Sequence, residues 1–292
     1  MGTVRQAWTV IADAAAGWIA DDAMSLAASI AFYTAFSLAP VVVLVTALAG
    51  LVFGREAAQG ALMAQLAGLI GVEPARAVQA LAASAADPQA GRWAGLLGGL
   101  TMIVGATTVF TELQTALNRI WKAAPPAAAT LTWLVAARLK GLALIGAIGF
   151  LLIVSLAVSA ALAALGVGMG RWLPDVAALL WAANTLLSWA VFTVLFALVY
   201  RVLPDVRIPW RCLRIGAMVT AFLFLAGKML IGLYLGTAGI ATVYGAAGSF
   251  ALILLWVYYS AAIFLFGAEI TRACSQRSGR PAGGGADPRP AA

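Results

Sequence analysis

The sequence predicts an all-α, polytopic integral membrane protein with six transmembrane helices and amphipathic interfacial helices. Three observations predict it: the composition, six long apolar runs, and the uneven placement of arginine and lysine. Of the 292 residues, 63% are hydrophobic and 10% are charged, and the mean hydropathy is +0.98. A soluble domain has about 25% charged residues. Water would not tolerate this much apolar surface, whereas a bilayer accommodates it.

The N-terminal segment, residues 1–26, predicts an amphipathic helix at the cytoplasmic face. Its apolar side chains recur at spacings of three and four residues: Val4, Trp8, Ile11, Ala15 and Trp18. This spacing places them on one helical face. Two interpretations stay open, an interfacial helix anchored by its two tryptophans or a helix packed against the bundle.

The six apolar runs are predicted to be the spans of a membrane domain over residues 27–273. Because an α-helix rises 1.5 Å per residue, about 20 apolar residues are needed to cross ~30 Å of hydrocarbon. The runs lack the alternation over about ten residues that barrel strands show, so we expect helices. The predicted spans are 28–53, 93–113, 139–165, 176–199, 213–235 and 246–270.

Two further segments complete the predicted organisation. Residues 55–91 carry several charges among leucines at helical spacing, and predict amphipathic helices on the extracytoplasmic surface. Residues 274–292 are rich in glycine, proline and arginine, and predict a disordered cytoplasmic tail.

The distribution of basic residues predicts the orientation. Thirteen arginines and lysines fall in the N-terminal segment, the second and fourth loops and the tail, against four in the other loops. The positive-inside rule then places both termini in the cytoplasm. The net charge of +7 therefore reflects topology and does not require nucleic acid. Cys212 and Cys274 fall on the cytoplasmic side, where thiols stay reduced, so no structural disulfide is expected.

Several ordered motifs carry a family resemblance. They are residues 21–40 (DDAMSLAASIAFYTAFSLAP), 117–121 (LNRIW), 203–209 (LPDVRIP) and 216–271, which contains Gly227-Lys228, Tyr244-Gly245 and GAEIT. In this order, over about residues 5–273, the chain resembles the BrkB/YihY family of bacterial inner-membrane proteins. The family was once labelled ribonuclease BN, a label widely regarded as a misassignment. The resemblance implies six transmembrane helices, a sizeable extracytoplasmic segment after the first, and an envelope role that includes transport of lipid-like molecules.

Lys228 is the sharpest candidate for a functional residue. It lies 14 residues beyond Arg214 on the fifth predicted span, which is about 21 Å into the helix. A charged lysine near the bilayer centre costs about 3 kcal/mol on insertion scales. The side chain therefore needs a partner or water. It is either a cationic site for an anionic substrate, or a lysine that is structurally paired or reaches the outer interface.

Polar residues on the first and fourth predicted spans are candidates for a substrate path. They recur every four residues and so share one face of each helix: Ser29, Tyr33, Ser37, Asn184 and Ser188. Pro40 follows the first set and removes a backbone hydrogen bond from the helix. These side chains either line a hydrophilic path or form hydrogen bonds between helices, and the second interpretation is slightly favoured.

Other residues are candidates for substrate contact, structural roles or gating. Residues 236–245 are uncharged and glycine-rich, and predict either a loop that bends back into the membrane or a flexible hairpin. Tyr244 is the candidate substrate contact in this segment. The candidate structural or gating residues are Pro40, Glu269, Arg201, Gly227 and Gly245. Glu269 is expected to pair with Arg201, Arg119 or another base at the cytoplasmic end, because Lys228 lies too far along the membrane normal.

These observations favour a transporter or translocase of a lipid-like or anionic substrate. The alternative is a non-transporting scaffold or accessory protein for envelope assembly. An enzyme, including a ribonuclease, is not expected, because the chain has no histidine and no carboxylate cluster or nucleophile motif. We expect no cofactor, no metal and no nucleic acid. The expected partners are membrane lipids, an anionic lipid or small-molecule substrate, and a second copy of the chain through small-residue surfaces.

Overall fold

The fold is helical throughout the part of the chain that the computed structural model describes. The described residues are 2–70, 75–76, 78–79, 92–123, 135, 138–151, 154–155, 158, 175–238 and 240–278. The labelled helices are α1 (Gly2–Ala20), α2 (Ala23–Phe53), α3 (Arg55–Ile70), α5 (Arg92–Ile120), α7 (Asp175–Val202), α8 (Trp210–Ala238) and α9 (Ile240–Arg277). Residues 138–151 are also helical.

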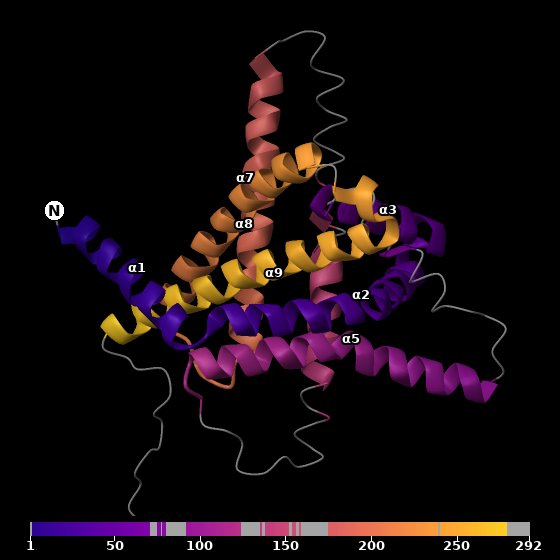
Figure 1. Cartoon of the computed structure of the whole chain (residues 1–292), viewed down its shortest axis with the longest axis horizontal. Helices are drawn as coiled ribbons and strands as arrows, with labels where there is room; N and C mark the ends of the chain where they lie inside the picture. The colour runs from indigo at the N-terminus through magenta and orange to yellow at the C-terminus, as the bar shows by residue number, and fades with distance from the viewer. Residues whose placement is uncertain are drawn as a thin grey trace, which may run out of the picture.

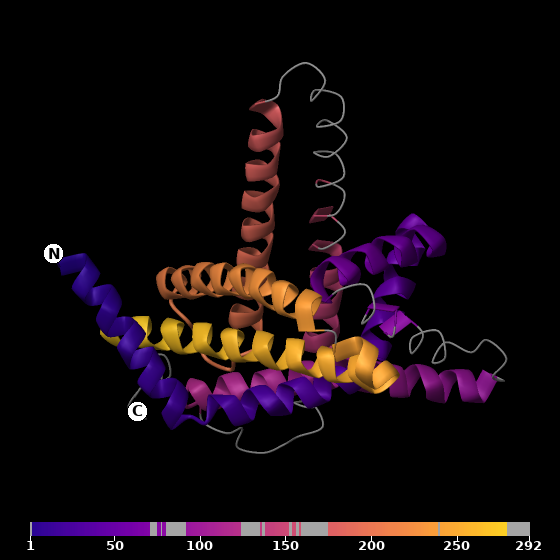
Figure 2. The same ribbon diagram turned by 45° about the horizontal axis from the view of Figure 1, so that its top comes forward.

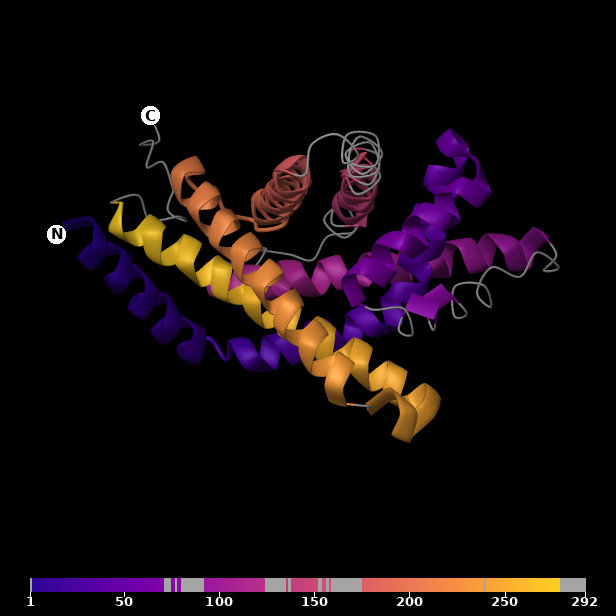
Figure 3. The same ribbon diagram turned by 90° about the horizontal axis from the view of Figure 1, so that it is seen from above.

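Helix α9 is the centre of the arrangement. Helices α1, α2 and α8 all pack against it, α5 packs against α2, and α7 packs against α8. Figure 1 shows α2, α5 and α9 running beside one another, and Figure 2 shows α7 rising steeply from them. Seen from above, α1 follows the C-terminal part of α9 (Figure 3). The start of α2 and the end of α9 therefore lie at the same end of the molecule.

Three of these helices are long and apolar enough to cross a membrane, among the described residues. They are the segments Ala182–Val202, Trp210–Met229 and Ile253–Arg277 of α7, α8 and α9. Helix α2 is a fourth if its two straight parts, Ala23–Leu38 and Val41–Ala47, count as one span. These parts meet at 49°, and Pro40 lies at the bend, where it cannot donate to the preceding turn.

Two predicted boundaries are wrong. The glycine-rich segment 236–245 is not a loop, because α8 extends to Ala238 and α9 begins at Ile240. Each glycine costs about 1 kcal/mol against alanine in a helix, which an apolar segment without proline tolerates. The predicted tail also begins later than residue 274, because α9 continues to Arg277. The side chains of Tyr244 and Pro40 and residues 279–292 lie outside what the structure describes.

The main core includes buried residues of α2, α5, α7, α8 and α9, and one part of it lies where α7, α8 and α9 meet. The Tyr200 hydroxyl donates to the Phe264 carbonyl oxygen at 2.6 Å, and it lies 3.0 Å from Thr220 Oγ1. Helices α7 and α9 approach closely here because Gly267 has no side chain. A Cβ on Gly267 would lie 2.5 Å from the Tyr200 hydroxyl. Small residues at such contacts let helix backbones approach in membranes. The hydroxyls are thereby paired inside an otherwise apolar core.

Candidate functional site

An ionic cluster with two buried carboxylates occupies the end of the molecule where α1, α2, α5 and α9 meet. Arg272 Nη1 lies 2.8 Å from Asp21 Oδ2 and 3.5 Å from Glu269 Oε2. The Lys122 ammonium pairs with the other oxygen of Asp21. Asp21 and Glu269 are only 3% and 2% exposed. Because a buried charge without a partner is costly, these bases stabilise the ionised form of both carboxylates. We call Asp21, Lys122, Glu269 and Arg272 the ionic cluster.

Breaks in the helices bring the members of the ionic cluster together. Asp21 lies in the two-residue turn between α1 and α2, and its neighbour Asp22 has a φ of 52°. Lys122 lies in the turn after α5 with a φ of 51°. Non-glycine residues rarely adopt this left-handed conformation, and where they do the surrounding structure imposes it. Arg272 lies three residues after Glu269 and so shares its face of α9.

Three buried polar atoms without a hydrogen-bond partner belong to the ionic cluster or to residues close to it in the sequence. Among the buried side chains that the structure describes, Trp18 Nε1, Trp121 Nε1 and Glu269 Oε1 have no hydrogen-bond partner. Gly17 makes room for Glu269, since a Cβ on Gly17 would lie 2.5 Å from Glu269 Oε2. Buried polar groups of native proteins are nearly all paired, and the exceptions need an explanation. Two donors and one acceptor thus remain available to water or to a polar ligand.

A second polar group fastens the loop between α7 and α8 to α5. Asp205 Oδ2 accepts hydrogen bonds from Gln114 Nε2 at 3.0 Å and from Asn118 Nδ2 at 2.9 Å. The Asp205 backbone N–H donates to Asn118 Oδ1 at 2.9 Å, and Lys140 lies 3.4 Å from Asp205 Oδ1. This loop therefore has a defined position relative to the ionic cluster.

The motifs that the sequence presents separately meet at this end of the molecule. Residues 117–121 contact the start of residues 21–40 through Arg119 and Asp22, at 3.3 Å. They contact residues 203–209 through Asn118 and Asp205. The ionic cluster then connects Asp21 to the motif that contains Glu269. The motifs thus describe one three-dimensional region.

Among the predicted partners of Glu269, the structure selects the alternative of another base at the same end of the molecule. Glu269 pairs with Arg272, another base at this end, and not with Arg201 or Arg119. Arg201 donates to the Ile208 carbonyl oxygen at 3.2 Å and stacks on the Trp210 ring at 5.1 Å. The sequence offered no means to choose among bases at one end, because loop conformation decides which of them approaches Glu269.

Two of the five predicted polar residues form side-chain hydrogen bonds within their own helices. The hydroxyl of Ser37 donates to the Thr34 carbonyl oxygen at 3.2 Å, and that of Ser188 to the Asn184 carbonyl oxygen at 2.9 Å. Ser29 differs, because its hydroxyl reaches Glu112 Oε2 on α5 at 3.3 Å. Ser29 lies eight residues beyond Asp21, so this contact is about 12 Å deeper along α2 than the ionic cluster. Tyr33 is partly exposed.

Lys228 lies half-buried on the side of α8 that faces other helices. It follows Ala221 and Phe224 by seven and four residues, and so shares their helical face. Both are buried, and the Phe224 ring lies 4.9 Å from Phe192 on α7 and 5.5 Å from Trp256 on α9.

The residue beside it, Gly227, is in close contact with α9. A Cβ on Gly227 would lie 2.6 Å from Tyr259 Cζ. The predicted site residues thus fall into separate groups, with Ser29, Tyr33 and Ser37 on α2, Asn184 and Ser188 on α7, and Lys228 on α8. Helices α2 and α8 both pack against α9.

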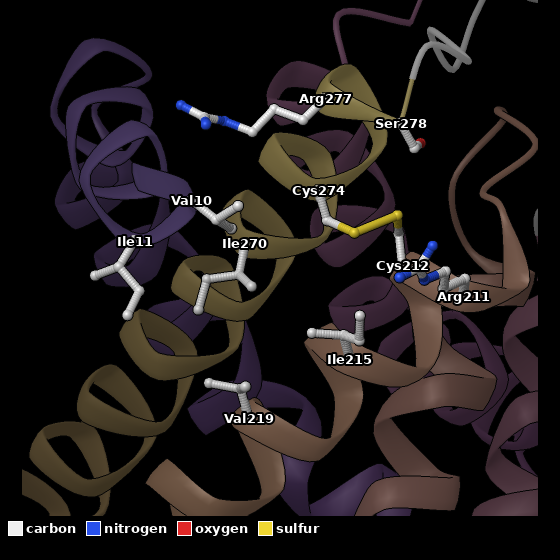
Figure 4. A pocket seen from close by; sticks show the side chains of 10 residues that line it. All are labelled: Val10, Ile11, Arg211, Cys212, Ile215, Val219, Ile270, Cys274, Arg277 and Ser278. Carbon is white, nitrogen blue, oxygen red and sulfur yellow. A yellow bond between two sulfur atoms is a disulfide. The ribbon is translucent and has the colours of Figure 1, made fainter. Parts of the chain in front are cut away.

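A pocket lies between α1, α8 and α9, beside a disulfide (Figure 4). Its volume is about 650 Å³. Cys212 and Cys274 are joined in its wall, with their Cα atoms 5.6 Å apart. The prediction that these cysteines form no disulfide is therefore wrong for this structure. The prediction rested only on the reducing conditions of the cytoplasm. The antiparallel packing of α8 and α9 places the start of α8 beside the end of α9, and so brings the two cysteines together.

Sequence reasoning missed Lys122, Arg272 and Asp205. Lys122 and Arg272 entered only in the count of basic residues that predicts the orientation, and Asp205 only as part of the motif 203–209. The signal that could have found them is position, because each lies at or near a helix end beside a motif. Helix ends have unpaired backbone groups and tight turns, so charged side chains there are well placed to join neighbouring elements.

Long apolar helices, joined at one end by buried ion pairs, define an all-helical integral membrane protein. The chain belongs to the family described as Virulence factor BrkB, whose model matches residues 14–291. It is 34% identical over 190 residues to a UPF0761 membrane protein of Pseudomonas paraeruginosa, covering 63% of this chain and 43% of that protein.

A second relative is UPF0761 membrane protein YihY of Escherichia coli O1:K1 / APEC. It is 34% identical over 184 residues, which cover 60% of this chain and 57% of YihY. The chain thus matches about half the length of these relatives. No solved structure matches the chain.

Proposed function

We propose that this chain is a six-span protein of the bacterial inner membrane that translocates a lipid-like anion, with both termini in the cytoplasm. The membrane class follows from the family, and the uneven placement of arginine and lysine supports the orientation. The helical residues 92–120 and 138–151 fall within or beside the second and third predicted spans, which supports six crossings.

The observation that carries this proposal is Lys228. It is a cation within the apolar segment Trp210–Met229, on the face of α8 that packs against α7 and α9. An ionisable residue inside a membrane protein is retained where it meets water, a partner or a substrate. A single ammonium on the same helical face as Phe224, whose ring packs on Phe192 and Trp256, suits an amphiphile that presents one anionic group and apolar chains.

The ionic cluster supplies the closed end that a translocase requires. It joins the α1–α2 turn to α5 and α9 through Asp21, Lys122 and Arg272. Separating these groups would open this end, and the bend of α2 at Pro40 offers a point about which the start of α2 could move. In this mechanism the substrate anion meets Lys228 while the ionic cluster stays intact.

Reconstitution tests the proposal. Protein in liposomes with a fluorescent anionic lipid on one leaflet should accelerate its movement to the other leaflet. We expect Lys228→Ala to reduce this rate at least tenfold and Lys228→Arg to retain most of it, because the cation is kept. Met229→Ala is the matched control, since Met229 is the adjacent residue and is exposed. Equal rates for Lys228→Ala and the unaltered protein would contradict the proposal.

The alternative is a membrane scaffold for envelope assembly. Exposed apolar side chains on α1, among them Trp8 at 71% exposure, favour a helix at the membrane surface that a partner could also contact. A scaffold would show no lipid movement in the same liposomes and would recover a defined partner after crosslinking in cells. Lipid movement by the purified protein would demote this alternative.

A further inference from the structure

We infer that the pocket between α1, α8 and α9 is a binding site for an anionic phospholipid, with its phosphate at Arg211 and one acyl chain inside. The lining residues are Val10, Ile11, Arg211, Cys212, Ile215, Val219, Ile270, Cys274, Arg277 and Ser278. The site lies at the start of α8 and the end of α9, apart from Lys228. Lipid binding here would therefore stand even if the chain moved no lipid.

The pocket is charged at one end and apolar along its length. Arg211, Ile215 and Val219 follow one another at four-residue spacing, so they form one face of α8. Ile215 and Val219 lie about 6 and 12 Å further along the helix than Arg211. Figure 4 shows the same order, with Arg211 beside the disulfide and Val219 at the opposite end. This polarity matches a molecule with a charged head and a hydrocarbon chain.

Of the two arginines that line the pocket, only Arg211 is free to bind an anionic ligand. Arg277 Nε donates to Asp13 Oδ2 at 2.7 Å and its Nη1 donates to Thr9 Oγ1 at 2.7 Å, so Arg277 fastens α1 to α9. Arg211 is exposed and has no ion pair within the described part of the chain. The pocket thus carries one uncompensated positive charge at its mouth, which favours an anionic head over a zwitterionic one.

The dimensions fit one chain of a membrane lipid. A volume of about 650 Å³ is within the 300–1,000 Å³ of ligand sites. The apolar depth of about 12 Å compares with roughly 15 Å for one leaflet, half of the ~30 Å hydrocarbon core. Ile270 forms one apolar cluster with Ala14 and Ala273, and Val10 and Val219 pack against this cluster. An acyl chain would extend that cluster.

Photocrosslinking tests the site on the full-length protein. The protein is placed in nanodiscs that contain phosphatidylcholine and a trace of phosphatidylglycerol with a photoreactive acyl chain, and the crosslinked peptides are identified by mass spectrometry. We expect crosslinks to peptides that contain residues 10–11 and 215–219. Val219→Trp, which fills the pocket, should remove them. Arg211→Gln should reduce them about fivefold, the factor for ~1 kcal/mol from one arginine near an anionic surface.

Arg214→Gln is the matched control, because Arg214 is an exposed arginine one turn from Arg211 that does not line the pocket. It should leave the crosslinks unchanged. Equal losses in Arg211→Gln and Arg214→Gln would overturn the inference, since they would show attraction to the surface in general. So would equal crosslinking by a photoreactive phosphatidylcholine, or displacement of the probe by oleate at the same concentration as phosphatidylglycerol, which would indicate a fatty-acid site. Thermal melting of each variant confirms that it is folded.

Discussion

The side chain of Arg272 is shared by two buried carboxylates, those of Asp21 and Glu269. A buried ion pair is weak support for stability on balance, because removing charges from water is costly. Removing one partner, however, leaves the others uncompensated. The consequences of substitution at this residue are therefore larger than the net contribution of the pair.

We predict that Arg272→Ala lowers the free energy of unfolding by about 3–5 kcal/mol. The measurement is denaturant or thermal unfolding in detergent. Arg277 offers the matched control, because its ion pair with Asp13 is solvent-exposed and such pairs contribute at most about 1 kcal/mol. Equal effects of Arg272→Ala and Arg277→Ala would show that burial of the ionic cluster does not govern its energetics.

Gly216 tests the close approach of α8 and α9. A Cβ at this position would overlap the Thr271 hydroxyl and lie 3.1 Å from the Gly267 carbonyl oxygen. We predict that Gly216→Ala destabilises the protein by about 1–3 kcal/mol, the usual cost of overpacking. Gly60→Ala on α3 should instead stabilise it by about 0.5–1 kcal/mol, because nothing lies within 4 Å and alanine favours the helix. Melting temperatures that move in the same direction would refute this contrast.

Single helices were largely predictable from the sequence, and their contacts were not. Apolar length places α2, α7, α8 and α9, because lipid leaves few alternatives to a helix. The contacts of Glu269 depended on the α1–α2 turn and on the backbone of Lys122, which hydropathy does not encode. Asp205 likewise meets Asn118 across 87 positions. Such pairings are set by packing between helices, where periodicity within one segment carries no information.

The cysteine pair joins two elements, the start of α8 and the end of α9. Cys212 and Cys274 are 62 positions apart, and closing a chain segment of this length stabilises a protein by roughly 2–4 kcal/mol. We predict that Cys212→Ser and Cys274→Ser each lower the melting temperature of the oxidised protein, and that the double variant is no less stable than either single one. A reducing agent should reproduce the loss. Additive effects of the two substitutions would contradict a shared bond.

At the scale of the whole molecule, two observations bear on the orientation of the chain in the membrane. Thirteen basic residues favour one side as the cytoplasm, whereas a disulfide on that side is unusual in a reducing compartment. The positive-inside rule describes how the chain inserts into the membrane, whereas the disulfide depends on the redox conditions that the protein meets after insertion. Both observations hold if the thiols are reduced in the cell and paired after exposure to oxidant.

We predict that both ends of the chain are closed to reagents applied from outside the cell. Because Cys212 and Cys274 are the only cysteines, the double serine variant provides a background without thiols. Cysteine introduced at Trp8 or at Gln276 should react with a membrane-impermeant maleimide only after the cells are permeabilised. Cysteine at Glu56, on α3, should react in intact cells. The reverse pattern would invert the proposed orientation.

The α8–α9 pair is stapled at one end by sulfur and continuous at the other, since α9 begins two positions after α8 ends. Two helices that are joined at both ends cannot separate to admit a bulky ligand between them. A ligand that enters the neighbouring pocket from the membrane must therefore pass between α1 and the α8–α9 pair. Arg277 holds α1 at this position. Formation of the disulfide would leave this entrance beside α1 unchanged and would make the α8–α9 side of the pocket rigid.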